Sequence, residues 1–421
     1  MASIPSPRTN WAGNFAYSAQ QLITPATVKE AQAAVRAAVH IRVLGSRHSF
    51  NALADTPDTQ LSLAALQSIS LDRAAQTVTL GAGVRYGDLA PVIDAQGFAL
   101  HNLASLPHIS VAGAIATGTH GSGLRSGNLA TAVSALEFID GRGDLVRLSR
   151  AANPDVFPGA VVHLGALGVL TRITLDVERT YQVAQSVFLD LPFAALEDRL
   201  EAIFAAGDSV SLFTDWQHSR ATQVWIKRRM DRSHPAFGRD FRGARAATAK
   251  THPILGHPAE ACTDQLGVPG PWHQRLPHFR LEFTPSSGQE LQSEYFVRFE
   301  EGYLAIRAVE ALRDRITPLL YVSELRAVAA DDLWLSPAYE RLSLAIHFTW
   351  KPDEPAVRAL LPRIEAALAP FNPRPHWGKV FTLPAAAMRG EYRRVADFRA
   401  LVAGSDPNGK FRNPFLAAAL Y

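Results

Sequence analysis

The chain has 421 residues, of which 47% are hydrophobic and 19% are charged. This balance is typical of a folded globular protein and excludes an intrinsically disordered one, and the length suggests two or three domains. Lysine and arginine exceed aspartate and glutamate only by 42 to 39. We therefore expect no nucleic-acid partner, because such proteins usually concentrate far more basic charge.

The expected compartment follows from the single cysteine and from the lack of long apolar runs. One cysteine, Cys262, excludes an internal disulfide and a multi-cysteine metal site. No apolar run is long enough to cross a bilayer, and residues 1–8 contain no apolar signal segment. We expect a cytoplasmic protein with no membrane partner. Without a coiled-coil pattern or a long exposed apolar stretch, we expect a monomer.

Short helices and strands alternate in the first 180 residues. Thr27 and Glu30 have the spacing of a capping box, which predicts a helix start. The apolar residues that then recur at helical intervals are Val28, Ala31, Val35 and Val39. A second helix is predicted over 86–95, closed by Gly97. Strands are predicted at 41–44, 60–63, 68–71, 77–80, 136–139, 145–148 and 169–177.

Longer elements are predicted after residue 180. They are strands at 291–299, 319–328 and 342–350, and a helix at 355–368 with one apolar face. A polar basic stretch covers 218–250, and 253–277 is rich in proline and glycine and predicts an irregular loop. The whole pattern favours an α+β protein with parts at 1–180, 181–370 and 371–421, the last returning to the first.

Two loops of small residues stand out. The denser covers 104–123, where backbone N–H groups, hydroxyls and amides could bind a pyrophosphate. The other, 45–50, follows a predicted strand and contains His48. A single glycine would indicate only a tight turn, but a run of this length predicts a diphosphate ligand.

Two other sequence patterns, one of glycines and one of histidines, do not indicate a function. Residues 81–87 follow a strand and precede a helix, but their spacing is GxGxxxG and not the GxGxxG of a Rossmann turn. The chain has 14 histidines but no HExxH motif. His252 and His257 lie in the proline-rich loop with only Glu260 and Asp264 nearby in sequence, so we predict no metal site.

Ordered motifs along almost the whole chain resemble the FAD-linked oxidases of the vanillyl-alcohol oxidase type, and within them most closely the alditol oxidases. The motifs are NWAGN at 10–14, GSRHSF at 45–50, ASLPHISVAGAIATGTHGSG at 104–123, LFTDW at 212–216, GVPGPWH at 267–273, SEY at 293–295, ELR at 324–326, RPHWGK at 374–379 and DPNGKF at 406–411. The resemblance implies a two-lobed FAD-binding domain at 1–180 with two α+β subdomains, an α+β substrate (cap) domain at 181–370, and a C-terminal segment at 371–421.

The resemblance also implies the site residues. His48 would be joined covalently to the 8α-methyl group of FAD. The other residues implied to contact FAD are Gly45, Ser46, Arg47, Ser49, Ser105, Ser110, Gly113, Thr117, Gly118, Thr119, His120, Val169, Thr349 and His376. Those implied to contact a polyol are Ser105, Glu324, Arg326 and Lys379. His347 would lie near the reacting carbon, and it joins Lys379, Arg326 and Glu324 as a catalytic candidate.

The implied activity is oxidation of the terminal C1 hydroxyl of alditols such as xylitol and sorbitol to the aldose, with hydride transfer to flavin N5 and O2 reduced to H2O2. No protein side chain accepts hydride, so a cofactor must. Glu324 and Arg326 are two apart, so on a strand they face the same side and could bind vicinal hydroxyls together. Taken alone, that pair favours a surface ion pair on a sheet face, and Lys379 could be a solvated lysine.

Three alternatives remain. A sugar-1,4-lactone oxidase or dehydrogenase is the closest, because the SEY and HWGK segments are also similar to that branch. A nucleic-acid-binding surface would use interleaved Trp225 and Phe237 with basic residues of the 218–250 stretch. These are Arg220, Lys227, Arg228, Arg229, Arg232, Arg239, Arg242, Arg245 and Lys250. A solvated basic face is the simpler interpretation. The third alternative is a flavin-storage protein.

Overall fold

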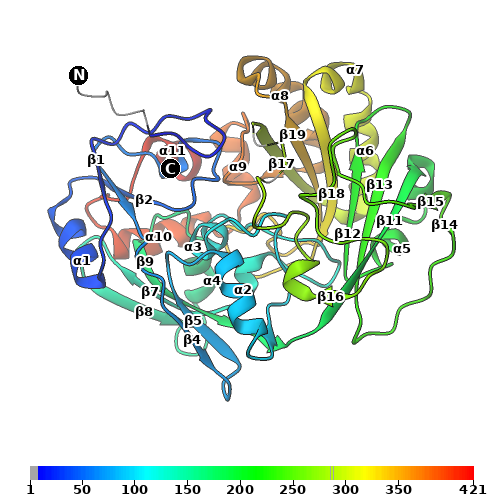
Figure 1. Ribbon diagram of the computed structural model, residues 1–421. Helices are drawn as coiled ribbons and strands as arrows, with labels where there is room; N and C mark the ends of the chain where they lie inside the picture. Colours follow the sequence, from blue (N-terminus) through cyan, green and yellow to red (C-terminus); the bar gives the residue numbers. More distant parts are fainter. Residues whose placement is uncertain (1–7, 285, 288) are drawn as a thin grey trace, which may run out of the picture.

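Separate sheets build two lobes in the computed structural model, which describes residues 8–284, 286–287 and 289–421 (Figure 1). The first lobe contains an antiparallel sheet of order β4-β5-β9-β7-β8 and a parallel sheet of order β1-β3-β2. Its strands are β1 (Gln21–Ile23), β2 (Ile41–Leu44), β3 (Thr59–Ser62), β4 (Ile69–Asp72), β5 (Thr77–Gly81), β6 (Phe98–Ala99), β7 (Val133–Ile139), β8 (Leu145–Ser149), β9 (Val169–Asp176) and β10 (Glu178–Arg179). Its helices are α1 (Val28–Ala37), α2 (Tyr86–Asp94), α3 (Val111–Ala116) and α4 (Phe157–Val161).

The capping signal before α1 works as the sequence predicts, but the helix is shorter than expected. The Thr27 side chain accepts a hydrogen bond from the Glu30 N–H. The Glu30 carboxylate accepts from the Ala26 N–H. The expected helical position of Val39 is wrong, because α1 ends at Ala37 and Val39 is 71% exposed. The chain turns there to enter β2.

The second lobe is one long antiparallel sheet of order β14-β15-β11-β13-β12-β18-β19-β17-β20, with β16 paired to β11. Its strands are β11 (Gln182–Pro192), β12 (Ser209–Thr214), β13 (Arg220–Arg229), β14 (Asp240–Phe241), β15 (Ala244–Ala246), β16 (Gly270–Pro271), β17 (Leu291–Arg298), β18 (Leu320–Val328), β19 (Ser343–Trp350) and β20 (Arg374–Pro375). The helices beside it are α5 (Leu200–Phe204), α6 (Gly302–Glu310), α7 (Arg313–Ile316) and α8 (Glu354–Leu368).

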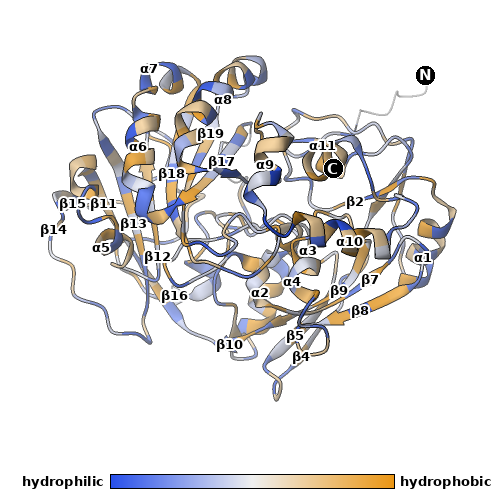
Figure 2. Cartoon of the chain, turned by 180° about the vertical axis from the view of Figure 1, so that it is seen from behind, coloured by the Kyte–Doolittle hydropathy of each residue, from blue (hydrophilic) through white to orange (hydrophobic). Residues whose placement is uncertain are grey.

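The two faces of this sheet differ in chemistry. Alternate residues such as Leu325 and Ile346 pack in an apolar cluster with residues of α6 and α8. Their neighbours Glu324 and His347 face the opposite way and line a cavity. In Figure 2 the strands of this sheet carry both hydrophobic and hydrophilic colour, as the helices beside it do. The polar residues of the sheet are therefore buried on the side turned away from the helices.

The C-terminal helices α9 (Ala385–Glu391), α10 (Val395–Ser405) and α11 (Pro414–Leu420) lie back on the first lobe (Figure 1). Phe398, Phe411 and Leu416 belong to the same buried cluster as strands β5, β7 and β9. Arg42 joins the parts because its guanidinium, buried in that lobe, donates to the carbonyls of Phe411 and Leu53. Residues 369 positions apart thus share one core.

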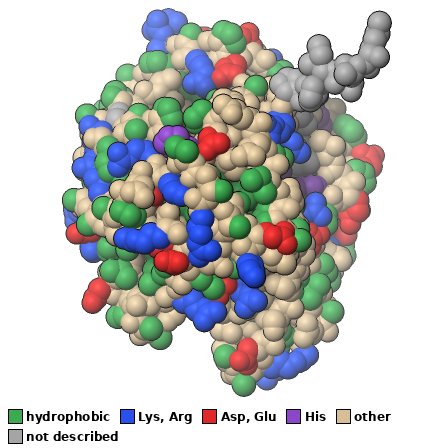
Figure 3. Space-filling model, turned by 90° about the vertical axis from the view of Figure 1, so that its left-hand side faces the viewer, with side chains coloured by type: hydrophobic (Ala, Val, Ile, Leu, Met, Phe, Trp, Pro, Cys, Tyr) green, Lys and Arg blue, Asp and Glu red, His purple; other side chains and the backbone are tan. Residues whose placement is uncertain are grey.

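The basic stretch 218–250 is not a solvated face throughout. Lys227 and Trp225 lie inside the second lobe, 1% and 0% exposed. A buried tryptophan cannot stack on a base, so this part of the nucleic-acid hypothesis is wrong. On the face drawn in Figure 3, lysine and arginine are interspersed with aspartate and glutamate. In the part of the chain that the structure describes, no helix has the length and apolar character to span a membrane.

Candidate active site

Two adjoining cavities bring together most of the residues expected to form the site. The larger has a volume of about 600 Å³ and lies in the first lobe, between the two small-residue loops. The expected cofactor residues that line it are Gly45, Ser46, Arg47, His48, Ser49, Ser110, Gly113, Thr117, Thr119 and His376. Its size suits a large organic ligand.

The smaller cavity, about 130 Å³, lies against the polar face of the second-lobe sheet. The expected residues that line it are His48, Ser105, Thr119, His120, Glu324, Arg326, His347, Thr349, His376 and Lys379. His48, Thr119 and His376 line both cavities, so these residues mark the place where the two meet. Gly118 and Val169 line neither one; Val169 is fully buried in β9.

The two small-residue loops are held to each other by a hydrogen bond. Ser110 caps α3 by accepting from the Gly113 N–H, and its own N–H donates to Ser46 Oγ at 3.1 Å. A Cβ on Gly45 in the other loop would lie 3.0 Å from Ser110 Oγ and 4.0 Å from the Cα of Gly113. The small residues therefore allow the close approach of the loops that form one wall of the larger cavity.

The imidazole ring of His48 lies in this wall and is available for reaction. Its ring stacks on Trp11 with centroids 5.3 Å apart, and among the described residues neither ring nitrogen has a hydrogen-bond partner. Burial lowers the pKa of His48 to about 4, so the ring is neutral at pH 7. A shielded, neutral imidazole with an available lone pair is a competent nucleophile.

Glu294 is the centre of a buried charge cluster in the smaller cavity. Its carboxylate accepts from Arg326 Nη2 at 2.8 Å and from Lys379 Nζ at 2.6 Å. His120 Nε2 lies 3.2 Å from the same carboxylate. Burial opposes ionisation of Glu294, but Lys379 and the other nearby cations hold its pKa well below its usual value. The cluster therefore keeps a carboxylate charged inside the protein.

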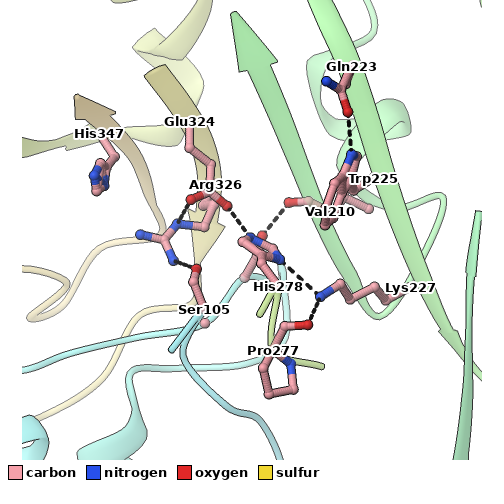
Figure 4. Close-up of polar contacts among 12 residues, drawn as sticks. Ser105, Val210, Gln223, Trp225, Lys227, Pro277, His278, Glu324, Arg326 and His347 are labelled. Atoms are coloured by element: carbon pink, nitrogen blue, oxygen red, sulfur yellow. Dashed lines mark hydrogen bonds and ion pairs between the residues drawn. The ribbon is translucent and has the colours of Figure 1, made fainter. Parts of the chain in front are cut away.

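Glu324 and Arg326 face the same side of β18, as their spacing predicts, with Arg326 Nε 3.6 Å from Glu324 Oε2. The interpretation as a surface ion pair is wrong, because the two residues are 6% and 5% exposed. Arg326 Nη1 also donates to Ser105 Oγ at 3.3 Å, which joins the sheet to the first lobe (Figure 4). Arg326 thus contacts two of the other residues expected to bind the polyol, Glu324 and Ser105.

His347 lies on β19 between Glu324 on β18 and Glu294 on β17, and Lys379 contacts both His347 and Glu294. Lys379 Nζ is 3.2 Å from His347 Nδ1, and Thr349 Oγ1 is 3.3 Å from His347 Nε2. Lys379 is not the solvated lysine considered above, since its side chain is only 12% exposed. Burial lowers its pKa, and burial followed by the nearby Lys379 charge holds the pKa of His347 well below its usual value. His347 is therefore neutral.

Glu294, Lys227 and His278 are site residues that the sequence motifs do not predict. Glu294 was quoted only as part of the SEY motif, yet it faces His347 across β17 and β19. His278 Nε2 lies 2.7 Å from Glu324 Oε1, and Lys227 Nζ lies 3.1 Å from His278 Nδ1. No local pattern marks Lys227 or His278; only the pairing of distant strands and a loop could find them.

Comparison with known proteins agrees with this geometry. Residues 19–149 match a family described as FAD binding domain, and residues 288–419 match one described as D-arabinono-1,4-lactone oxidase. Cholesterol oxidases share the fold. One described as solvent-stable aligns with a TM-score of 0.78 and 13% identity over 99% of this chain and 97% of its own. One from B. sterolicum has a TM-score of 0.77 and 15% identity over 99% and 96%. These matches define an FAD-binding oxidoreductase.

Relatives define the branch. The chain is 52% identical to an alditol oxidase from Streptomyces sp., over 97% of both chains. It is 26% identical to an L-gulono-1,4-lactone dehydrogenase from Mycobacterium tuberculosis and 25% identical to an L-gulonolactone oxidase from Mus musculus, each over 98% of both chains. The chain therefore belongs to the alditol oxidase family, within the FAD-linked oxidases of the vanillyl-alcohol oxidase type.

Proposed function

We propose that the protein is an FAD-dependent alditol oxidase, which converts the terminal C1 hydroxyl of xylitol or sorbitol to the aldose and reduces O2 to H2O2. The observation that carries the proposal is that the buried Glu294 cluster, with Glu324 and Ser105, lines the smaller cavity. His48 and His376 line both this cavity and the larger one, so the two cavities meet beside the cluster. The alditol oxidase relative supports the same activity.

The residues of the larger cavity fit FAD. The small-residue loops supply backbone N–H groups and hydroxyls suited to a pyrophosphate. His48 offers two unpartnered, shielded ring nitrogens at the junction of the cavities. We propose that one of them bonds to the 8α-methyl carbon of the flavin, which would place the ring system against the smaller cavity. When bound, FAD accepts hydride from the substrate carbon and passes the electrons to O2.

The smaller cavity fits a polyol. Ser105, Glu324, Arg326 and Lys379 supply hydroxyl, carboxylate, guanidinium and ammonium groups, which together accept from and donate to adjacent hydroxyls. Glu324 is ionised, because the nearby Arg326 and His278 overcome the effect of burial and hold its pKa well below its usual value. Its Oε2 can therefore accept a hydrogen bond from a substrate hydroxyl, while Oε1 is paired with His278.

We propose the following roles in the chemistry. Arg326 and Lys379 bind the C1 oxygen and stabilise the negative charge that develops there as the hydroxyl proton leaves. His347 is neutral and 3.2 Å from Lys379 Nζ, so it is the candidate that accepts the proton. Exclusion of water by the buried cluster strengthens each of these charge interactions.

Substrate oxidation tests the function. Purified holoenzyme should release H2O2 with xylitol or sorbitol at a kcat/KM at least tenfold higher than with L-gulono-1,4-lactone. The alternative, a sugar-lactone oxidase, predicts the reverse order, and a flavin-storage protein predicts no steady-state H2O2. Either result would contradict the proposal.

The covalent bond is tested by denaturation. Acid-precipitated wild-type protein should keep its yellow flavin in the pellet, whereas His48→Ala should release it into the supernatant. His40→Ala, a change at an exposed histidine, is the control and should keep the colour in the pellet. A pellet that stays yellow in His48→Ala would disprove the assignment of His48.

A further inference from the structure

A chain of hydrogen-bonded side chains extends from the polyol cavity into the second lobe (Figure 4). It begins at Glu324 Oε1, which lies 2.7 Å from His278 Nε2. His278 Nδ1 in turn lies 3.1 Å from Lys227 Nζ. Lys227 belongs to β13, two strands from Glu324 in the sheet, whereas His278 lies in the wall of the smaller cavity.

The donors and acceptors around Lys227 can be counted. Its Nζ contacts three groups, the carbonyls of Leu276 and Pro277 and His278 Nδ1. The carbonyls only accept, and an ammonium has three N–H donors and no acceptor. A charged Lys227 therefore satisfies all three contacts only if His278 Nδ1 accepts.

This count fixes the state of His278. When Nδ1 accepts, the ring proton must be on Nε2, where it donates to Glu324. Burial, followed by the positive charge of Lys227, lowers the pKa of His278 to about 4, so the ring is neutral. In the other neutral tautomer an Nε2 lone pair would face the Glu324 carboxylate, and neither atom could donate.

The ring of His278 is also fixed mechanically. It packs edge-on against Phe213 and Trp225, with ring centroids 5.5 and 5.2 Å away. Its backbone N–H donates to the carbonyl of Ser105 at 3.0 Å. One residue therefore holds both the Glu324 carboxylate and the backbone of Ser105, two groups expected to bind the polyol.

We infer that Lys227 and His278 are positioning residues for substrate: Lys227 selects the His278 tautomer that donates to Glu324, and this bond keeps Glu324 aimed at the polyol hydroxyls. The inference rests on the proposed function. It adds a specificity device that begins at His278 in the cavity wall and ends at Lys227 behind it, since a carboxylate with one oxygen occupied by His278 presents its other oxygen, near Arg326, to the substrate.

The charged groups around this chain of side chains all bear on its pH dependence. Glu324 is faced by His278 from the 276–279 loop, by Arg326 on its own strand and by His347 on β19. Burial lowers the pKa of Lys227 to about 7, so the ammonium is charged below that pH, and Glu324, Cys262 and Arg326 are the groups that face it. Removal of the Lys227 charge takes away a cation that disfavours protonation of His278, while the Glu324 carboxylate, which favours it, remains. The protonated form of His278 is therefore favoured in such a variant.

The decisive pair of variants is Lys227→Met and Lys227→Gln. Both are uncharged and similar in size, but only glutamine can still donate to His278 Nδ1. Lys227→Met should lower kcat/KM for xylitol about 10- to 100-fold, mainly through KM, as loss of an outer hydrogen-bond partner commonly does. Lys227→Gln should recover most of that loss. Lys250→Met is the control, because Lys250 donates to the carbonyl of Cys262 in the same loop region and not to His278.

A pH series separates positioning from a merely structural role. In Lys227→Met an imidazolium at His278 can again donate to Glu324, so the ratio of variant to wild-type kcat/KM should rise as pH falls from 6.5 to 5, a range in which the wild-type Lys227 keeps its charge. A ratio independent of pH, or a Lys227→Met variant as active as Lys227→Gln, would overturn the inference.

A readout without activity distinguishes failure of the inference from failure of the proposed function. In holoenzyme labelled with 15N-histidine, the His278 signal, assigned by its loss in His278→Gln, should show the neutral Nε2–H tautomer at pH 6. An Nδ1–H tautomer or an imidazolium would refute the inference even if xylitol is oxidised. If the expected tautomer is present but no polyol is oxidised, the proposed function fails and the hydrogen-bonded chain of side chains remains.

Discussion

Lys379 shows how one residue depends on distant parts of the chain. Its backbone carbonyl accepts from the Asn51 side chain at 2.9 Å, and its Nζ donates to Glu294. Asn51 comes from the first lobe and Glu294 from the second-lobe sheet. The ammonium is therefore held between the lobes, where the proposed C1 oxygen would lie. Its conformational freedom is lost in folding and not in each catalytic cycle.

Replacement of Lys379 by methionine tests its proposed role at the C1 oxygen. Lys379→Met keeps the volume of the side chain but removes the charge, so kcat on xylitol should fall about 100- to 1000-fold, as loss of one stabilising donor commonly does. Steady-state H2O2 production measures the effect. Lys351→Met, at an exposed lysine, should leave kcat within about twofold of wild type. Wild-type turnover in Lys379→Met would exclude the assigned role.

At the scale of elements, the glycines of 81–87 have a structural explanation. A Cβ at Gly83 would lie 2.1 Å from the carbonyl oxygen of Leu63, and one at Gly81 would lie 2.3 Å from that of Leu66. Gly83 N–H donates to the Leu66 carbonyl at 3.0 Å. The motif that resembles a nucleotide-binding turn therefore exists because the backbone after β5 passes very close to the 63–66 segment.

Alanine at Gly83 should be strongly destabilising, because the clash is with backbone atoms that cannot rotate away. We expect Gly83→Ala to lower the free energy of unfolding by about 3 kcal/mol or more. Gly404→Ala is the matched control, since Gly404 lies in α10 with no neighbour within 4 Å of an added Cβ. It should raise the free energy by about 0.5–1 kcal/mol. Urea unfolding of both variants measures the difference, and equal effects would contradict the explanation.

At the scale of the whole molecule, buried histidines make the stability of the folded protein depend on pH. Burial lowers the pKa of His163 to about 3 and that of His278 to about 4. The unfolded chain binds protons at these residues below about pH 6.5, whereas the folded protein does not until these lower values. Unfolded protein therefore binds more protons in this window, and stability falls as pH falls from 6.5 toward 4.

We expect the holoenzyme to lose about 2 kcal/mol of unfolding free energy for each such histidine between pH 7 and pH 5. Urea denaturation at the two pH values measures the loss. His163→Gln should show a smaller loss than wild type, whereas His40→Gln, at an exposed position, should show the same loss as wild type. Identical pH dependence in His163→Gln would show that His163 does not contribute.

The sequence by itself determined the parts of the protein that local pattern encodes. The capping residues before α1, the strand periodicity that puts Glu324 and Arg326 on one side of β18, and the ordered motifs of the family all depend on neighbours within a few positions. The two small-residue loops were recognisable for the same reason, since close backbone approach requires small side chains in the loop itself.

Only the tertiary structure decided burial and charge. Glu294, Lys227 and His278 meet the rest of the site through pairings between β17, β18, β19 and β13 and through a loop contact, which no local pattern encodes. Whether an ion pair is exposed or buried depends on what covers the sheet, and here the first lobe covers it. Because the free energy of a charge depends on its desolvation and its partners, these residues acquired their chemistry only on folding.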